Sequence, residues 1–143
     1  MTLEIVRIAD TRGVLQTVCG VRTGDELLAG NRRMFFERTA DFAACRFWYA
    51  DFTGSDLRGV GADHIRELAQ IAEQAASANP SLLTAIVTPE DLQYGLGRMW
   101  ATITEATGWE CRTFRSREEA SAWLAERLDL PRDELLRAHG SGA

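Results

Sequence analysis

Lysine is absent from this chain of 143 residues, and all sixteen of its positively charged side chains are arginines. The absence excludes the P-loop lysine that contacts nucleotide phosphates and the lysine that forms a Schiff base with a carbonyl substrate. It also excludes the lysine switch of receiver domains. Lysine-dependent chemistry of every kind is therefore ruled out for this protein.

Cysteine and histidine are also scarce. The three cysteines, Cys19, Cys45 and Cys111, include no C-x-x-C pair, and each lies in a segment that we predict to be a strand. We interpret them as small buried apolar residues, the alternative being a metal or redox role. The two histidines, His64 and His139, lie far apart in the chain. We predict no metal site and no cofactor.

Long apolar runs and an excess of positive charge are missing as well. No run approaches the roughly 20 apolar residues that a membrane span needs, and the opening MTLEIVRIAD lacks the basic and apolar regions of a signal peptide. The net charge of −5 and the pI of about 5.1 argue against a nucleic-acid-binding face. We expect a cytoplasmic protein that neither spans a membrane nor binds nucleic acid.

The sequence does contain an alternation of strand and helix patterns. Two β-rich runs, residues 3–10 and 13–20, are separated by Thr11 and Arg12 and predict a hairpin. Apolar runs typical of buried strands then alternate with helical patterns, in the order β-β-α-β-α-β-α-β-α; these strands cover residues 45–52, 82–88 and 110–115. The order predicts a single α/β domain: a mostly parallel five-stranded sheet with an antiparallel N-terminal edge strand and about four helices.

Capping patterns mark where the helices begin. Thr23 with Glu26 and Ser116 with Glu119 form capping boxes. Thr88, followed by Pro89 and Asp91, is interpreted as the cap of the third helix, and Asp63 as the cap of the second. The second helix carries an apolar stripe of Ile65, Leu68, Ala69, Ala72, Ala75 and Ala76, and ends at Asn79-Pro80.

The third helix contains two glycines, in the stretch EDLQYGLGRMW (residues 90–100). The G-x-G-x-x-G loop that binds dinucleotides does not fit, because Trp100 stands at its sixth position. We predict an unbroken helix with an inner stripe of Leu92, Leu96, Met99, Ile103 and Ala106. Gly95 lies in that stripe and would let the helix approach the sheet. Gly97 would lie on the flank under Trp100. A hinge or a close approach by a ligand is the alternative.

The segment TAIVTPEDLQYGLGRMWATITEATGWECRTFRSREEASAWL resembles the uncharacterised bacterial STAS-like family, which is grouped with the anti-sigma-factor antagonists and the CRAL-TRIO domains. The resemblance covers about residues 3–128 and also fits DFTG followed by IRELA. It is carried by Tyr94, Gly95, Arg98, Met99, Phe114, Arg115, Glu118, Glu119, Ala120, Trp123 and Leu124. It implies a STAS-like domain over residues 1–128, and we expect a short helical turn and a flexible tail in residues 129–143.

Candidate site residues follow the strands, because ligands of open parallel sheets bind beyond the carboxyl ends of the strands. The loops 51–64 and 88–91 supply polar side chains there: Asp51, Thr53, Ser55, Asp56, Asp63, His64, Glu90 and Asp91. Carboxylates in such loops could hold Mg²⁺, but the chain has no D-x-D phosphatase pattern and no G-x-S-x-G elbow. We expect solvated carboxylates, helix caps and a surface histidine.

Two further features of the resemblance concern a switch and a contact surface. STAS regulators carry a phosphorylated Ser or Thr at the start of the helix that follows the loop 51–64. Here that helix start reads GADHI, without a hydroxyl. Thr53 and Ser55 lie upstream. Tyr94 and Arg98, four residues apart on one helix, predict either a surface pair with a stacked guanidinium or a contact for an anion or a partner.

The function that these patterns predict is a non-catalytic STAS-like interaction or regulatory module that binds a protein partner or itself. The alternative is a carrier of a small apolar or lipid-like ligand, with a pocket lined by Phe35, Phe36, Trp48, Trp100 and Trp123. We expect no enzyme. The tail residues 130–139 must dock on their own domain or on a second copy, because so short a helix is unstable alone. We therefore expect a homodimer.

Overall fold

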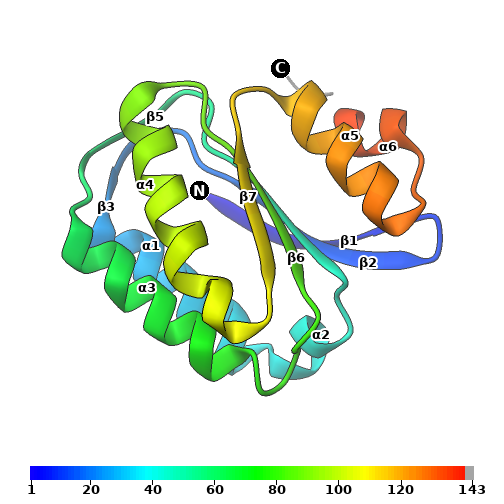
Figure 1. Cartoon of the computed structure of the whole chain (residues 1–143), viewed down its shortest axis with the longest axis horizontal. Helices are drawn as coiled ribbons and strands as arrows, with labels where there is room; N and C mark the ends of the chain where they lie inside the picture. The colour runs from blue at the N-terminus through cyan, green and yellow to red at the C-terminus, as the bar shows by residue number, and fades with distance from the viewer. Residues whose placement is uncertain (141–143) are drawn as a thin grey trace.

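The computed structural model describes residues 1–140 as an α/β fold built on a five-stranded sheet (Figure 1). The strand order is β1-β2-β4-β6-β7; β1 is antiparallel to β2, and the other neighbours are parallel. The strands are β1 (Thr2–Ile8), β2 (Thr11–Thr17), β4 (Phe47–Asp51), β6 (Leu83–Val87) and β7 (Glu110–Phe114). The predicted sheet, with its antiparallel N-terminal edge strand, is confirmed.

The hairpin turn lies two residues before its predicted place. Ala9 and Asp10 form it, Ala9 adopts a φ of 52°, and Ile8 pairs with Thr11. The prediction put Thr11 and Arg12 in the turn because Gly13 follows them. Gly13 instead lies within β2, where a side chain would collide with the ring of Phe47 on the neighbouring strand.

A second, two-stranded sheet was not predicted. β3 (Gly20–Thr23) pairs in parallel with β5 (Ser55–Gly59) just beyond the carboxyl ends of β2 and β4. Both strands are short and largely polar, so they lack the apolar pattern that marks a buried strand. Gly20 begins β3 and Gly54 precedes β5, with φ values of 71° and 79°, at which a side chain would be strained.

The described residues form six α-helices rather than about four. They are α1 (Gly24–Arg32), α2 (Thr39–Ala43), α3 (Ala62–Ala75), α4 (Asp91–Thr104), α5 (Arg117–Leu128) and α6 (Arg132–Gly140). One extra helix arises because the first predicted helix changes to a π-helical turn over Arg33–Glu37 and then restarts as α2. The other is α6, where only a short turn was expected. No helix of residues 1–140 is long and apolar enough to cross a bilayer.

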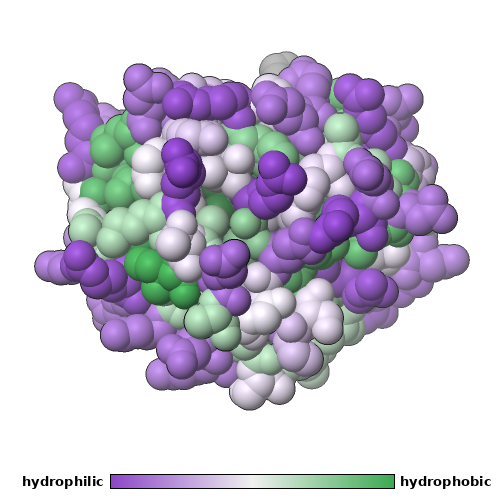
Figure 2. Space-filling view, in the orientation of Figure 1, coloured by the Kyte–Doolittle hydropathy of each residue, from purple (hydrophilic) through white to green (hydrophobic). Residues whose placement is uncertain are grey.

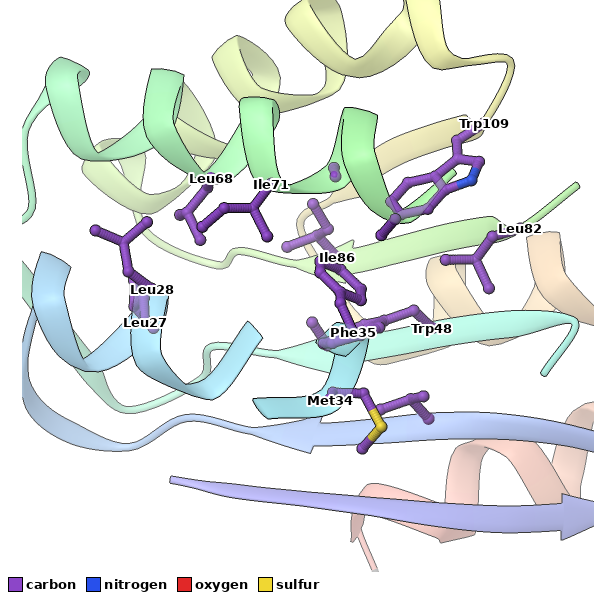
Figure 3. Packing of buried hydrophobic residues seen from close by; sticks show 14 of the residues in the cluster. Leu27, Leu28, Met34, Phe35, Trp48, Leu68, Ile71, Leu82, Ile86 and Trp109 are labelled. Carbon is purple, nitrogen blue, oxygen red and sulfur yellow. The ribbon is translucent and has the colours of Figure 1, made fainter. Parts of the chain in front are cut away.

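The sheet separates two apolar layers (Figure 1). On one side α1, α3 and α4 cover the larger cluster, which includes Phe35, Trp48, Ile86 and Trp109 (Figure 3). On the other side α5 and α6 cover a smaller one, which includes Tyr49 and Leu124. Alternate residues of each strand face opposite layers, as pleating requires. The α3 stripe predicted from its apolar spacing is buried throughout.

Of the four predicted helix caps, those at Thr23 and Ser116 hold, and those at Thr88 and Asp63 do not. Thr23 Oγ1 accepts the N–H of Glu26 at 3.1 Å, and Ser116 Oγ accepts the N–H of Glu119 at 3.2 Å. Thr88 is not a cap: its buried hydroxyl lies 2.5 Å from Thr113 Oγ1. Helix α4 begins three residues later.

The cysteines also depart from the prediction. Cys111 lies in β7, but Cys45 precedes β4 and Cys19 lies between β2 and β3. Cys45 is buried as expected, and burial raises the pKa of its thiol to about 11. Cys19 is exposed.

Helix α4 runs unbroken through both glycines, as predicted, but its faces are exchanged. A Cβ on Gly97 would lie 2.8 Å from Thr113 Oγ1, whereas a Cβ on Gly95 would meet nothing within 4 Å. Gly97 is therefore the residue that lets the helix approach the sheet. The buried residues of α4 are Gln93, Gly97 and Thr104. Leu96 and Met99 of the predicted inner stripe pack against the core, but Leu92 and Ile103 are exposed. The stripe was wrong at these two residues, because Gln93 and Thr104 are buried despite being polar.

Candidate functional site

Asp51 ends β4 and is the most deeply buried of the candidate side chains. Its Oδ1 accepts the N–H of Thr53 at 3.0 Å and the hydroxyl of Thr53 at 2.6 Å, and its Oδ2 accepts Arg117 Nε–H at 2.7 Å. Burial alone would raise the pKa of Asp51, but these hydrogen bonds and the Arg117 charge outweigh it and lower the pKa. Asp51 is thus a charged, fully engaged carboxylate, which is poorly suited to act as a base.

A second polar group lies on the same side of the sheet. His139 on α6 has Nε2 3.0 Å from the carbonyl oxygen of Tyr49 and Nδ1 3.2 Å from Thr17 Oγ1. The Tyr49 hydroxyl lies 2.8 Å from Ser121 Oγ, and burial raises the pKa of Tyr49 to about 12. Burial lowers the pKa of His139, against the opposing effects of Asp51 and the Tyr49 carbonyl. These contacts attach α5 and α6 to the sheet.

Ser55 and Asp56 open β5 and engage different partners. Ser55 is buried, and its hydroxyl donates to the carbonyl of Phe52 at 2.7 Å and accepts from Gln93 Nε2 at 3.0 Å. Asp56 pairs with Arg58 at 2.6 Å, and hydrogen bonds from Arg58 lower the pKa of Asp56 to about 2. Ser55 joins β5 to α4, and Asp56 closes a local turn.

His64 has a structural place at the start of α3. Its Nδ1 accepts the N–H of Gly61 at 3.0 Å, so His64 satisfies the backbone of the cap residue Gly61, which has no side chain to complete a capping box. The prediction that Asp63 caps this helix was wrong, since its side chain is almost fully exposed and pairs with Arg66. The ring of His64 packs against the backbone of Gly24, where a Cβ would collide with it. The imidazole is therefore held between two helix starts.

The guanidinium stacked on Tyr94 belongs to Arg115. The Arg115 Cζ lies 4.1 Å from the centre of the Tyr94 ring, and Arg115 Nη1 donates to Asp91 Oδ1 at 2.8 Å. Arg98, the partner that the helical spacing indicated, is exposed and forms no ion pair among residues 1–140. Tyr94 is therefore stacked with Arg115 and not with Arg98.

The candidate residues do not converge on one reacting position. Asp51 and Thr53 form one group, Ser55, Asp56, His64 and Tyr94 each have separate partners, and Arg98 is exposed. Among residues 1–140, no three or more Cys, His, Asp or Glu side chains are grouped so that they could hold a metal ion. Sequence reasoning missed Arg117 and His139, which lie 66 and 88 residues beyond Asp51, and no local pattern links such positions.

The outer surface of α4 carries an apolar stripe. Leu92 and Ile103 are 47% and 39% exposed, and Leu96 and Met99 between them are partly buried. These four residues, here called the α4 stripe, recur at helical spacing on one side of the helix. Figure 2 shows apolar side chains gathered over the part of the molecule where α3 and α4 lie.

Comparison with known proteins places this geometry in a fold class. No family model and no curated protein matches the sequence. The structure matches the crystal structure of an uncharacterized protein of the DUF3478 family with a SpoIIAA-like fold, from Shewanella loihica PV-4. The TM-score is 0.55 at 16% sequence identity, and the match covers 86% of this chain and 92% of the other. The chain therefore has a SpoIIAA-like, STAS-like fold, which confirms the resemblance that the sequence indicated.

Proposed function

We propose that this protein is a non-catalytic STAS-like interaction module that docks through the α4 stripe. The observation that carries the proposal is the exposure of Leu92 and Ile103 on one helix face. Exposed apolar side chains that cluster on one face are typical of interaction sites in soluble proteins. The SpoIIAA-like fold of the uncharacterised neighbour is compatible with this role.

A second copy of the chain is the partner that the stripe fits. A two-fold interface must be self-complementary, since the same surface serves both copies. An axis through the middle of α4 would place Leu92 against the partner copy's residue 103 and Leu96 against its residue 99. The spacing of the four stripe residues is the same counted from either end. Antiparallel α4 helices would therefore pair apolar residues throughout. The open space beside Gly95 would let the two helices approach closely.

The C-terminal residues are not needed for this pairing. Leu135 on α6 is fully buried within its own domain, and Leu130 is nearly so. The tail therefore docks on its own copy, which was one of the two expected outcomes. Tyr94 and Arg98 lie on a different face of α4 from the stripe, so they remain candidate contacts for a partner other than the paired helix.

Sedimentation velocity of the full chain at tens of micromolar tests the pairing. We expect a dimer that Ile103→Glu and Leu92→Glu convert to monomer. Thr102→Glu is the matched control, because it adds the same charge at an exposed position beside the stripe. A wild-type monomer at this concentration would exclude self-pairing, and a dimer that survives both stripe variants would place the interface elsewhere.

The non-catalytic part of the proposal has its own test. Hydrolysis of p-nitrophenyl phosphate and p-nitrophenyl acetate should stay at the buffer rate, because the polar side chains at the strand ends are engaged in separate structural contacts. Turnover that is lost in Asp51→Asn or His64→Ala would contradict a non-catalytic module, whatever the oligomeric state.

A further inference from the structure

A cavity of about 80 Å³ lies inside the larger apolar layer, between the sheet and helices α1, α3 and α4. None of the side chains that line it is charged. Phe35, Trp48, Trp100 and Trp109 contribute aromatic rings, and Figure 3 shows three of them beside Ile86. Of the other aromatic residues predicted to line a pocket, Phe36 is exposed and Trp123 lies on the opposite side of the sheet.

Thr84 on β6 brings an unpartnered hydroxyl to this cavity. The residue lines the cavity and is 3% exposed. Among the residues that the structure describes, Thr84 Oγ1 is the one buried side-chain oxygen or nitrogen without a hydrogen-bond partner. The thiol of Cys111, its neighbour on β7, is a weak acceptor within reach of the Thr84 hydroxyl, and it also accepts the hydroxyl of Thr104 at 3.4 Å. A buried hydroxyl without a partner is destabilising, so its presence needs an explanation.

Most of the other polar groups of the wall are engaged. Trp48 Nε1–H donates to Gln16 Oε1 at 3.0 Å, and Trp109 Nε1–H donates to the Asn79 carbonyl at 2.7 Å. Gln93 Nε2 donates to the carbonyl oxygen of Phe52 at 2.9 Å. Asn31 on α1 also lines the cavity but is only partly buried; the hydroxyl of Thr84 is the free polar group that is fully buried there.

Such a wall is better suited to an organic molecule than to water. A buried water usually makes about three hydrogen bonds, and apolar cavities stay dry and take up apolar molecules. We propose that this cavity binds a small uncharged molecule with an aliphatic body and a single oxygen acceptor that receives the hydroxyl of Thr84. Since a cavity of roughly 150 Å³ holds benzene, this one suits a smaller molecule, such as a short-chain ketone or alcohol, rather than a lipid.

Leu96 of the α4 stripe also lines the cavity, but the site differs from the α4 pairing in depending on the hydroxyl of Thr84. Methyl-detected NMR with two probes of equal shape tests it. 2-Butanone carries the oxygen acceptor, and 2-methyl-1-butene replaces that oxygen with carbon. We expect both probes to shift the methyl signals of Ile65, Leu68 and Ile86, with butanone binding more tightly than the alkene.

Thr84→Val is the matched variant, since it replaces the hydroxyl with a methyl group of similar size. It should weaken butanone binding about three- to ten-fold, the worth of one hydrogen bond, and leave alkene binding unchanged or tighter. Xenon, which needs no acceptor, should shift the same methyl signals in both proteins.

Three outcomes would overturn the proposal. The first is the absence of any shift at these methyl groups with butanone, alkene and xenon. The second is equal butanone affinity in wild type and Thr84→Val, which would remove the hydroxyl from the site. The third is a long-lived water next to Thr84, detected by water–protein cross-relaxation, that saturating butanone does not displace.

Discussion

The two sides of the sheet differ in whether their buried polar groups have hydrogen-bond partners. On the α5/α6 side, Tyr49, Ser121 and His139 have mutual or backbone partners, and Asp51 has Arg117. On the α1/α3/α4 side, an aromatic-rich layer contains a cavity and one unpartnered hydroxyl. The first arrangement fixes the helices in one position, because buried polar groups are costly to separate from their partners. The second leaves an unfilled space, and the binding site that we propose lies there.

The largest effect should follow from breaking the buried ion pair on the α5/α6 side. Arg117→Met leaves the Asp51 carboxylate with Thr53 alone. We expect a loss of about 2 to 3 kcal/mol in the free energy of unfolding, less than a fully buried pair would lose because about a third of the Arg117 side chain is exposed.

Urea denaturation measures this loss, and Arg115→Met is its control. Arg115 stacks on Tyr94 and pairs with an exposed aspartate, so its replacement should cost about 0.5 kcal/mol. Equal losses in the two variants would mean that the Asp51–Arg117 pair contributes no more to the free energy of unfolding than the exposed Arg115 pair.

On the α1/α3/α4 side, the two glycines of α4 should respond in opposite ways. Gly97→Ala places a methyl group against Thr113 and should destabilise by about 1 to 2 kcal/mol. Gly95→Ala adds its methyl group in open space and should stabilise by up to about 1 kcal/mol, since alanine favours the helix. Urea melts that reverse this order would contradict the close approach of α4 to the sheet at Gly97.

Replacing the unpartnered hydroxyl should have a smaller effect of favourable sign. Thr84→Val removes a buried polar atom that lacks a partner and keeps the β-branched shape, so we expect stabilisation by about 1 kcal/mol. Ser121→Ala on the other side is the contrasting change, because it removes the partner of the Tyr49 hydroxyl and should destabilise. Thermal unfolding that shows both variants destabilised would mean that Thr84 has a partner in solution.

The smallest effect should be a pH dependence confined to the α5/α6 side. The pKa of His139 is lowered in the folded protein, so the unfolded chain binds the proton more readily. Its contribution is complete above the unfolded pKa of about 6.5 and is lost as the pH falls through the folded value. The lowered pKa of Asp51 adds a further loss below pH of about 4.

Unfolding free energies between pH 7.5 and pH 5 test the histidine. The decline should shrink in His139→Gln, which lacks the titrating group but can still donate to the Tyr49 carbonyl. An undiminished decline in His139→Gln would assign it to another group.

The sheet could be predicted because its strands are continuous apolar runs between capped helices. The orientation of α4 could not be predicted. A prediction from the apolar stripe assumes that Leu92 and Ile103 face inward and that Gln93 and Thr104 do not. Gln93 is buried instead, because its amide donates hydrogen bonds to the backbone carbonyls of Phe52 and Ser55. The end of β4 could be predicted as the place of Asp51. Its partner Arg117 could not, because only the folded chain brings them together.

The position of α6 late in the chain also determines when it can join the fold. Thr17 and His139 are in contact across 122 residues, and contacts over such separations slow folding because a long loop must close first. At about 5 to 20 residues per second, the ribosome adds the 88 residues between Asp51 and His139 in roughly 4 to 18 seconds. During that time the apolar side of β2 and β4 has no α6 to cover it, so this surface is exposed to aggregation or to chaperones before the fold is complete.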